Sequence, residues 1–296
     1  MTFMTHNEHR VSYHIQFWLE SYSRNTSISY GKTTSDFINF IGSVEKITIC
    51  SEKDIISFLN FLSPCSGKNK RGRPTLNIST STKNQRLSCL NAMFKMLIKN
   101  ECLGINPAQK IKISEEKPQK NPIVDIETIT EGLDKISKIY DPTLRARNKF
   151  IALLLLSNAL KRSEITNIRL EDIISEGIVI RNTKRSRLLH LNPSVLKAMK
   201  DWVKLRSSLS PYLLTSYARK EQGLEKLSNF AIRDFSMKFF KCCPQQLRTR
   251  SILDYWHRAS NDIDLVHIHS GNHSKQSTIR QINKNHVAYL PDYEKK

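Results

Sequence analysis

One short basic run of this chain has residue types that can bind an anion. Lys70, Arg71 and Arg73 lie around Gly72 and precede Pro74. Glycine permits a close approach of the backbone, and arginine is attracted to the strong negative potential of a narrow, A·T-rich minor groove. The run therefore predicts a DNA contact through Lys70, Arg71 and Arg73, with a solvated basic loop as the alternative.

A second cluster has residue types that bind metal ions. His267, His269 and His273 follow the adjacent pair Cys242 and Cys243. Their spacing does not match the helical or knuckle pairs of zinc sites, and no CxxC pair or carboxylate completes a ligand set. We therefore expect no metal here. No cofactor is expected either, because the sequence has no P-loop and no acidic cluster.

The elements that must position these residues are predicted to be mainly helices. Apolar residues recur at helical spacing from Asp54 to Leu62 and from Thr82 to Asn100, with Ser81 or Thr82 as the N-cap of the second helix. Short apolar runs on either side of a basic turn predict a β-hairpin with strands over 178–180 and 188–191. Further helices are expected over 128–140, 144–159, 194–205, 227–240, 248–255 and 277–283. The fold class is therefore mainly α with a small β-hairpin or sheet (α+β).

One stretch divides the chain. Residues 115–122 (EEKPQKNP) contain two prolines and no apolar side chain, which is typical of a linker. We expect a helical domain over residues 1–114 and a larger domain over 123–296.

The charge of the chain points to a polyanionic partner. Lys and Arg number 47 against 27 Asp and Glu, a net charge of +20, with an isoelectric point near 9.8. No segment is apolar for long enough to span a bilayer, and the N-terminus does not read as a signal peptide. Six cysteines without a CxxC pair indicate an intracellular protein with reduced thiols. The expected partner is double-stranded DNA rather than a membrane, and the expected location is DNA-associated, in the cytoplasm, nucleoid or nucleus.

Four motifs, in order along the chain, carry a resemblance to a known family. The apolar run 150–156 is followed by Leu160-Lys161-Arg162-Ser163-Glu164-Ile165 and by Leu170-Glu171-Asp172. The hairpin tip reads Thr183-Lys184-Arg185-Ser186-Arg187, and Gln245-Gln246-Leu247-Arg248 and Gly271-Asn272-His273-Ser274 come later. This series resembles the signature boxes of the tyrosine recombinases (the phage integrase family), and the order of the boxes argues against an unrelated basic helical protein.

The resemblance implies both a fold and a chemistry. Residues 1–114 would form the helical, SAM-like core-binding domain, residues 123–296 the catalytic-fold domain, and the two would close around DNA as a clamp. A tyrosine hydroxyl attacks a phosphodiester and leaves a 3′-phosphotyrosyl link, without metal or cofactor. Two arginines and a histidine hold the phosphate oxygens, and a hairpin lysine protonates the leaving 5′-oxygen. Self-association on DNA is also implied.

Carried over to this chain, the resemblance selects five basic residues as candidate catalytic groups and two more as DNA contacts. The first arginine falls on Lys161, followed by Arg162, whose side chain would point about 100° away if both lay on one helix. The remaining candidates are the hairpin lysine Lys184, the second arginine Arg248, the last histidine His273, and the DNA contacts Arg185 and Arg187.

Three positions depart from the family pattern. Lysine at 161 loses the bidentate guanidinium, Gln245 replaces a histidine, and Ile282, about nine residues after His273, has no hydroxyl. Tyr289, and after it Tyr293, are the remaining candidates for the nucleophile. We therefore expect a DNA-binding protein of the tyrosine recombinase fold that is impaired or inactive in cleavage. The alternative is an active site-specific recombinase that uses a displaced C-terminal tyrosine.

Overall fold

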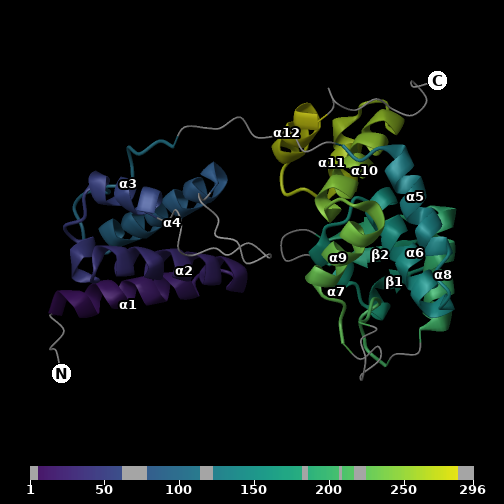
Figure 1. The fold of residues 1–296 in the computed structure, drawn as a ribbon, viewed down its shortest axis with the longest axis horizontal. Coiled ribbons are helices and arrows are strands. Elements are labelled where there is room, and N and C mark those ends of the chain that lie inside the picture. Colours follow the sequence, from purple (N-terminus) through teal and green to yellow (C-terminus); the bar gives the residue numbers. More distant parts are fainter. Residues whose placement is uncertain are drawn as a thin grey trace. The chain divides into compact units, whose positions relative to one another are not determined.

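The computed structural model describes residues 6–61, 79–113, 123–181, 186–206, 209–216 and 225–285. The chain divides into two compact units, unit 1 over Met1–Pro118 and unit 2 over Gln119–Lys296 (Figure 1). The basic run at 70–73, the linker expected over 115–122, and the hairpin-tip residues Lys184 and Arg185 lie outside the described residues. Tyr289 and Tyr293 do so as well.

Unit 1 is built from helices around an aromatic core. Its elements are α1 (His6–Glu20), α2 (Arg24–Ile41), the 3-10 helix η1 (Glu45–Ile47), α3 (Glu52–Phe61) and α4 (Thr80–Lys99). Phe37 of α2 lies edge-on to Phe58 and Phe94, with ring centroids 5.0 and 6.2 Å apart, and all three are fully buried. The expected N-cap of α4 was two or three residues late: the hydroxyl of Ser79 accepts the Thr82 N–H at 3.2 Å.

Unit 2 combines helices with a small antiparallel sheet. Its helices are α5 (Ile126–Ser137), α6 (Pro142–Ser157), α7 (Arg162–Asn167), α8 (Pro193–Leu205), α9 (Asn229–Phe240), α10 (Pro244–Arg258), α11 (Ile263–Ser270) and α12 (Lys275–Asn285), with the 3-10 helix η2 at Leu170–Asp172. The strands β1 (Ile173–Ile174), β2 (Gly177–Ile180) and β3 (Arg187–Leu189) pair in that order. The hairpin prediction is confirmed, because Ile178 pairs with Leu189 and Ile180 with Arg187.

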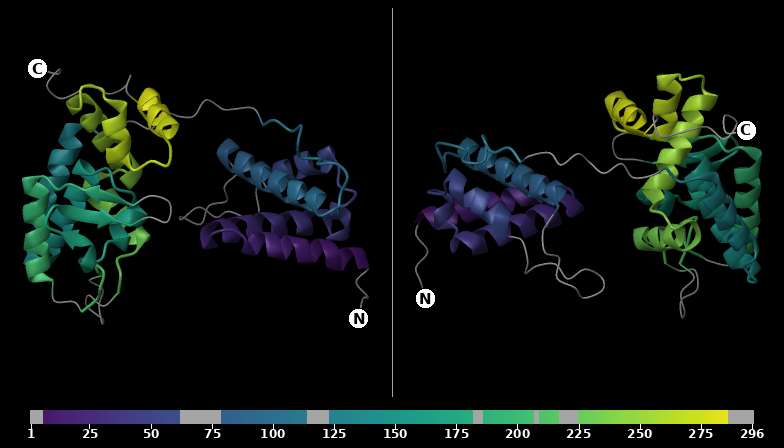
Figure 2. Two further views of the ribbon diagram at one scale, coloured as in Figure 1. Left: turned by 180° about the vertical axis from the view of Figure 1, so that it is seen from behind. Right: turned by 45° about the horizontal axis from the view of Figure 1, so that its top comes forward.

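The core of unit 2 lies where α5, α6, α8 and α9 pack together around buried apolar side chains (Figures 1 and 2). Trp202 of α8 is 1% exposed and donates its indole N–H to the Leu213 carbonyl at 2.9 Å. A separate cluster formed by Ile252, Val266 and Ile282 joins α10, α11 and α12. This second cluster fixes the turn between α11 and α12 against α10, and that turn is central to the site described below.

Two local features differ from the sequence expectation. The helix α11 was not predicted; it begins at the N-cap Asp262, whose carboxylate accepts the N–H groups of Asp264 and Leu265. Lys161 does not share a helix with Arg162, because Lys161 has extended backbone angles and α7 begins only at the next residue.

Within the described ranges, no helix is long and apolar enough to cross a membrane. Nor does this part of the chain hold a group of three or more His, Cys, Asp or Glu side chains that could hold a metal ion. Cys50, Cys89, Cys102, Cys242 and Cys243 are free thiols.

Candidate functional site

The site is organised around the turn that joins α11 to α12. α11 ends at Ser270, and the next residue, Gly271, has a φ of +58° and donates its N–H to the His267 carbonyl. A Cβ built on Gly271 would lie 2.1 Å from Nη1 of Arg187, so the guanidinium of Arg187 packs directly against the glycine backbone. The left-handed conformation favours glycine, and the absence of a Cβ allows the guanidinium to approach this closely.

Arg248 of α10 is the first of three cations that hold this turn. Its side chain is 4% exposed. Nε donates to the Ala159 carbonyl at 2.8 Å, and Nη2 donates to the Ser270 carbonyl and to Oδ1 of Asn272, both at 2.8 Å. Burial lowers the pKa of Arg248 to about 10. The guanidinium thus joins the end of α6 to the α11–α12 turn.

Lys161 and Arg187 hold the same turn from the other side. The Lys161 ammonium donates to the Gly271 carbonyl at 2.9 Å, and burial lowers its pKa. Arg187 donates to Oε1 of Glu164 at 2.8 Å, while Oε2 of Glu164 accepts the Lys161 backbone N–H at 2.8 Å. Arg187 was expected to contact DNA, yet its side chain is 9% exposed and paired with a carboxylate that is 5% exposed. The three residues Lys161, Arg187 and Arg248 are called the inner cations below.

The residue beside Arg248 is Asn272 and not His273. Asn272 is buried, and its Nδ2 donates to Oγ1 of Thr278 and to Oε1 of Gln281, each at 3.2 Å. His273, the expected catalytic histidine, is exposed. Because Gly271 bends the chain just before these residues, only Asn272 turns inward.

The resemblance places the nucleophile about nine residues after the last histidine of the motif. A shift of that histidine's position by one residue therefore shifts the expected position of the nucleophile by one residue as well. Counting from Asn272 reaches Gln281, whose side chain contacts Asn272 and donates from Nε2 to the Thr249 hydroxyl at 3.2 Å. Ile282, which the sequence analysis placed there, is 1% exposed and lies in the apolar cluster between α10, α11 and α12. The sequence signal that was missed is the residue immediately after Gly271.

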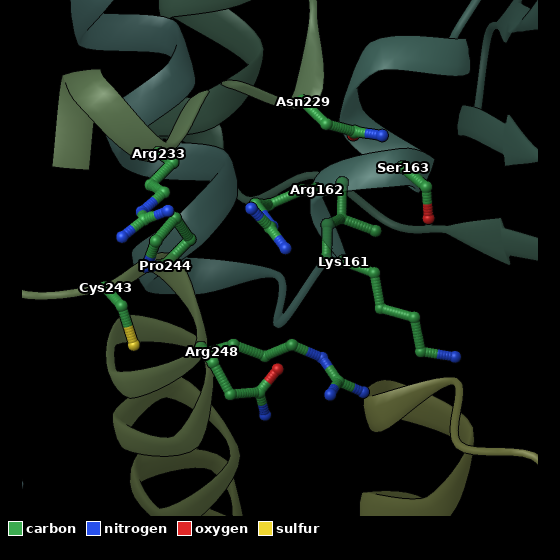
Figure 3. A pocket seen from close by; sticks show the side chains of 10 residues that line it. Lys161, Arg162, Ser163, Asn229, Arg233, Cys243, Pro244 and Arg248 are labelled. Atoms are coloured by element: carbon green, nitrogen blue, oxygen red, sulfur yellow. The ribbon is translucent and has the colours of Figure 1, made fainter. Parts of the chain in front are cut away.

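A cationic pocket of about 480 Å³ opens beside the inner cations. It is lined by residues from the start of α7, the start of α10 and α9: Leu160, Lys161, Arg162, Ser163, Asn229, Arg233, Cys243, Pro244, Gln245 and Arg248. Figure 3 shows Arg162 and Arg233 reaching toward the middle of the pocket, whereas Lys161 and Arg248 extend past it. Both Arg162 and Arg233 are exposed, and neither has an ion-pair partner in the described part of the chain. They are called the outer cations.

A second, smaller cavity of about 290 Å³ adjoins the first, since Cys243 and Gln245 line both. Most of its other lining residues have amide or basic side chains: Ile123, Gln246, Thr249, Arg280, Gln281, Lys284 and Asn285. Gln246 is engaged locally, because its Oε1 accepts the Cys243 N–H at 3.0 Å and so caps α10. Gln245, which stands in place of a histidine of the family pattern, therefore lies where the two cavities meet.

His269 is a half-buried residue that sequence reasoning placed only in a metal cluster that was set aside. Its ring stacks on Tyr255, with centroids 4.0 Å apart and planes 7° apart, and its Nε2 is buried without a hydrogen-bond partner. Burial lowers the pKa of His269 to about 4, and the charges of Arg258, Arg187 and Arg248 act in the same direction. The imidazole is neutral at pH 7, and it packs against the site rather than binding a metal.

Taken together, the site can bind a phosphodiester, but no tyrosine lines either cavity among the residues that the structure describes; the hydroxyls there are those of Ser163 and Thr249. The outer cations can pair with phosphate oxygens, and Gln245 can donate hydrogen bonds. The described tyrosines of unit 2 are Tyr140, which is 98% exposed at the α5–α6 turn, Tyr212 and Tyr255. Arg169 and Lys226 each lie over the ring of Tyr212, and Tyr255 stacks on His269.

Comparison of the sequence with known proteins finds similarity to tyrosine recombinases over part of the chain. No family model matches it. Tyrosine recombinase XerA of Pyrococcus horikoshii is 29% identical over 147 residues, which is 46% of this chain and 50% of the relative. Tyrosine recombinase XerC of Caldanaerobacter subterraneus is 25% identical over 228 residues, 65% of each chain. The matches thus span half to two thirds of the length of these curated relatives.

Comparison with solved structures finds the same fold over almost the whole chain. A lambda integrase dimer bound to a COC′ core site has a TM-score of 0.71 at 12% identity, covering 95% of this chain and 96% of the other. The Tn1549 transposon integrase in complex with circular intermediate DNA has a TM-score of 0.68 at 15% identity, covering 96% and 97%. The expected resemblance and the expected fold class are confirmed.

Proposed function

We propose that this chain, which has the fold of the tyrosine recombinases and integrases, binds duplex DNA without cutting it. The observation that carries the proposal is Gln281. It contacts Asn272, which in turn contacts Arg248, so an amide stands at the position from which the family's chemistry needs a hydroxyl. An amide cannot form the phosphotyrosyl link, whatever the neighbouring cations contribute.

Two further substitutions support binding without cleavage. Gln245 and Asn272 stand where the resemblance implies histidines. An amide can still hydrogen-bond, but it stays uncharged, so it cannot bring the positive charge of a protonated histidine to a phosphate oxygen. The charge that develops during cleavage is therefore stabilised less well. Removing even one donor that stabilises a transition-state charge costs about two to three orders of magnitude in rate.

The basic surface supports the binding half of the proposal. The outer cations Arg162 and Arg233 are exposed and have no ion-pair partner among the described residues, and the chain carries a net charge of +20. The proposal extends to basic residues outside the described ranges, with Lys70, Arg71, Arg73 and Arg185 as DNA contacts and Lys184 as a phosphate ligand. Residues 1–114 are assigned as the core-binding domain and 123–296 as the catalytic-fold domain. The solved relatives named above are DNA complexes, one of them a dimer, so self-association on DNA belongs to the same proposal.

The decisive experiment measures covalent protein–DNA adducts on the protein's own site. A binding site is first selected from a random duplex pool, and nicked suicide substrates carrying it are then incubated with the full chain. We expect retention of the duplex at low salt and no adduct that survives denaturation. A quadruple variant with Gln281→Tyr, Asn272→His, Gln245→His and Lys161→Arg should gain an adduct. The matched variant with Gln281→Phe instead, which lacks the hydroxyl, should not.

The alternative function gives a different pattern. If the wild-type chain forms an adduct that Tyr289→Phe abolishes without loss of DNA binding, the protein is an active recombinase with a displaced nucleophile. Loss on Tyr293→Phe alone would transfer that role to Tyr293. Failure to retain any duplex at low salt would overturn the DNA-binding proposal itself.

A further inference from the structure

Unit 2 has a groove that shares no residue with the cationic pocket. It lies between α5, α6 and α8, has a volume of about 870 Å³, and is larger than the cationic pocket. Figure 1 shows α6 and α8 on one flank of unit 2 and α7 and α9, which border the cationic pocket, on the other. A ligand in this groove therefore does not compete with a phosphate for the outer cations.

The floor of the groove is apolar. Leu133 and Ile136 of α5, Ala146 and Leu153 of α6, and Ala198 of α8 line it. Leu205, at the end of α8, is 40% exposed and extends the apolar surface toward solvent. An exposed apolar strip bordered by polar residues is typical of a surface that packs against another protein.

The walls of the groove are cationic. Lys149 of α6 and Lys197 and Lys204 of α8 are exposed, and none of them forms an ion pair with any residue that the structure describes. Lys197 and Lys204 lie two helical turns apart, and so on nearly the same side of α8. Among the residues that the structure describes, Asp201 is the one acidic residue that lines the groove. We therefore expect an occupant with acidic side chains, which would balance the positive charge of these lysines.

We propose that this groove binds an acidic amphipathic helix of a partner protein. Such a helix would place a stripe of leucine-like side chains on the floor and carboxylates beside Lys149, Lys197 and Lys204. DNA fits less well, because a phosphate backbone gains nothing from the apolar floor formed by Leu133 and Leu153. This inference goes beyond the proposed DNA binding. Because the groove and the cationic pocket share no residue, the protein could bind the partner helix and DNA at the same time.

The test uses the full-length protein and a fluorescein-labelled synthetic peptide of about 15 residues, with leucines at the a and d heptad positions and glutamates elsewhere. Fluorescence anisotropy should show saturable binding. The triple variant Lys149→Glu, Lys197→Glu, Lys204→Glu should weaken it at least about tenfold, because each lost charge contact is replaced by repulsion. Lys200→Glu, on the same helix but outside the groove lining, should change it less than about twofold.

Three comparisons decide between the occupants. A peptide of the same composition with the leucines scrambled off one face, and a helix with lysines in place of glutamates, should both bind at least about tenfold more weakly than the probe. Ala146→Trp should also block the probe; because this variant could fail to fold, the triple lysine variant provides the independent check. Equal binding of probe and scrambled peptide, or no saturable binding of the probe, would overturn the inference.

The DNA arm separates this inference from the proposed function. The triple lysine variant should bind the selected duplex as the wild type does, and Arg233→Glu should weaken DNA binding while leaving peptide binding unchanged. If the triple variant loses duplex binding by about tenfold and the peptide does not bind, the groove is a DNA contact and the peptide proposal fails. Loss of DNA binding on Arg233→Glu with intact peptide binding supports both.

Discussion

The inner and outer cations of unit 2 belong to one site but have different roles. Arg248 is 4% exposed and donates to three protein acceptors, whereas Arg162 and Arg233 are exposed and line the cationic pocket without an ion-pair partner among the described residues. A guanidinium whose donors are already used inside the protein contributes mainly to folding. One whose donors face solvent can exchange water for phosphate oxygens at small cost. Residue type alone therefore does not tell a phosphate ligand from a structural cation.

The same comparison explains why the turn at Gly271 is held so firmly. Its three carbonyl and amide acceptors at Ser270, Gly271 and Asn272 each receive a hydrogen bond from a cation, two from Arg248 and one from Lys161. Charge-assisted bonds in a buried place are stronger than neutral ones. The inner cations thus fix the position of Asn272 and, through it, of Gln281.

The largest expected effect comes from removing an inner cation. Arg248→Leu leaves the Ala159 and Ser270 carbonyls and Oδ1 of Asn272 without a donor, and should lower the free energy of unfolding by about 4 kcal/mol. Arg248→Lys keeps the charge but has fewer donors in reach, and should cost about half as much. Urea unfolding followed by circular dichroism measures both. A loss below about 1 kcal/mol for Arg248→Leu would break the distinction between inner and outer cations.

Much of the framework followed from local sequence. The hairpin was predictable because short apolar runs flank a basic turn, and its register places Ile178 opposite Leu189. α8 was placed to within one residue because apolar side chains recur at helical spacing and Trp202 faces the core. Such periodic patterns are set by burial of one face, and burial is visible in the sequence itself.

The site was less predictable, because its residues are chosen by contacts between distant segments. Arg187 looked like a DNA contact from its place after the hairpin tip, but Glu164, 23 residues earlier, pairs with it. The inward-facing residue after α11 depends on the left-handed turn at Gly271, so a motif aligned on His273 is out of step by one residue. No local pattern reports which donors have already been used in the folded chain.

A pH titration sharpens the comparison, because His269 is packed close to the inner cations. The pKa of His269 is about 4 in the folded protein, below the usual 6.5, since burial and the charges of Arg258, Arg187 and Arg248 disfavour its protonation. The unfolded chain therefore binds the additional proton between these pH values. The stability from neutral His269 is complete above pH 6.5 and is lost as pH falls toward 4, by about 2–3 kcal/mol.

The variant His269→Phe keeps a ring against Tyr255 and removes the titrating group. Its unfolding free energy should fall less steeply than that of the wild type between pH 7 and pH 4, as measured by urea unfolding at each pH. His273→Phe, at an exposed histidine, should keep the wild-type slope. Identical slopes for wild type and His269→Phe would show that His269 is not responsible for the acid sensitivity.

Gly271→Ala should have an intermediate effect on stability. The substitution strains a backbone with φ of +58° and pushes its Cβ into the guanidinium of Arg187, which then has to leave Glu164. We expect a loss of about 2 kcal/mol, of which about 1 kcal/mol comes from the left-handed conformation. Gly104→Ala is the matched control, because its Cβ would meet nothing within 4 Å. If both variants unfold at the same urea concentration, the guanidinium of Arg187 moves away at no cost, and its packing against Gly271 does not stabilise the turn.

The smallest effect on folding, and the clearest on DNA, is expected at the outer cations. Arg162→Ala and Arg233→Ala remove exposed side chains without a described partner, so each should change the free energy of unfolding by less than about 0.5 kcal/mol. If each arginine neutralises one phosphate, each substitution should reduce the slope of log affinity against log salt by about 0.9. Lys200→Ala, an exposed cation of α8 away from the pocket, should leave the slope unchanged. Salt titrations of duplex binding compare the three variants at equal protein stability.

A lower slope for the Arg162 and Arg233 variants with unchanged stability would mean that binding and folding depend on separate cations of one site. If the slope stays the same in both variants, the cationic pocket does not hold the DNA, and the phosphate contacts must lie on other basic residues of the chain.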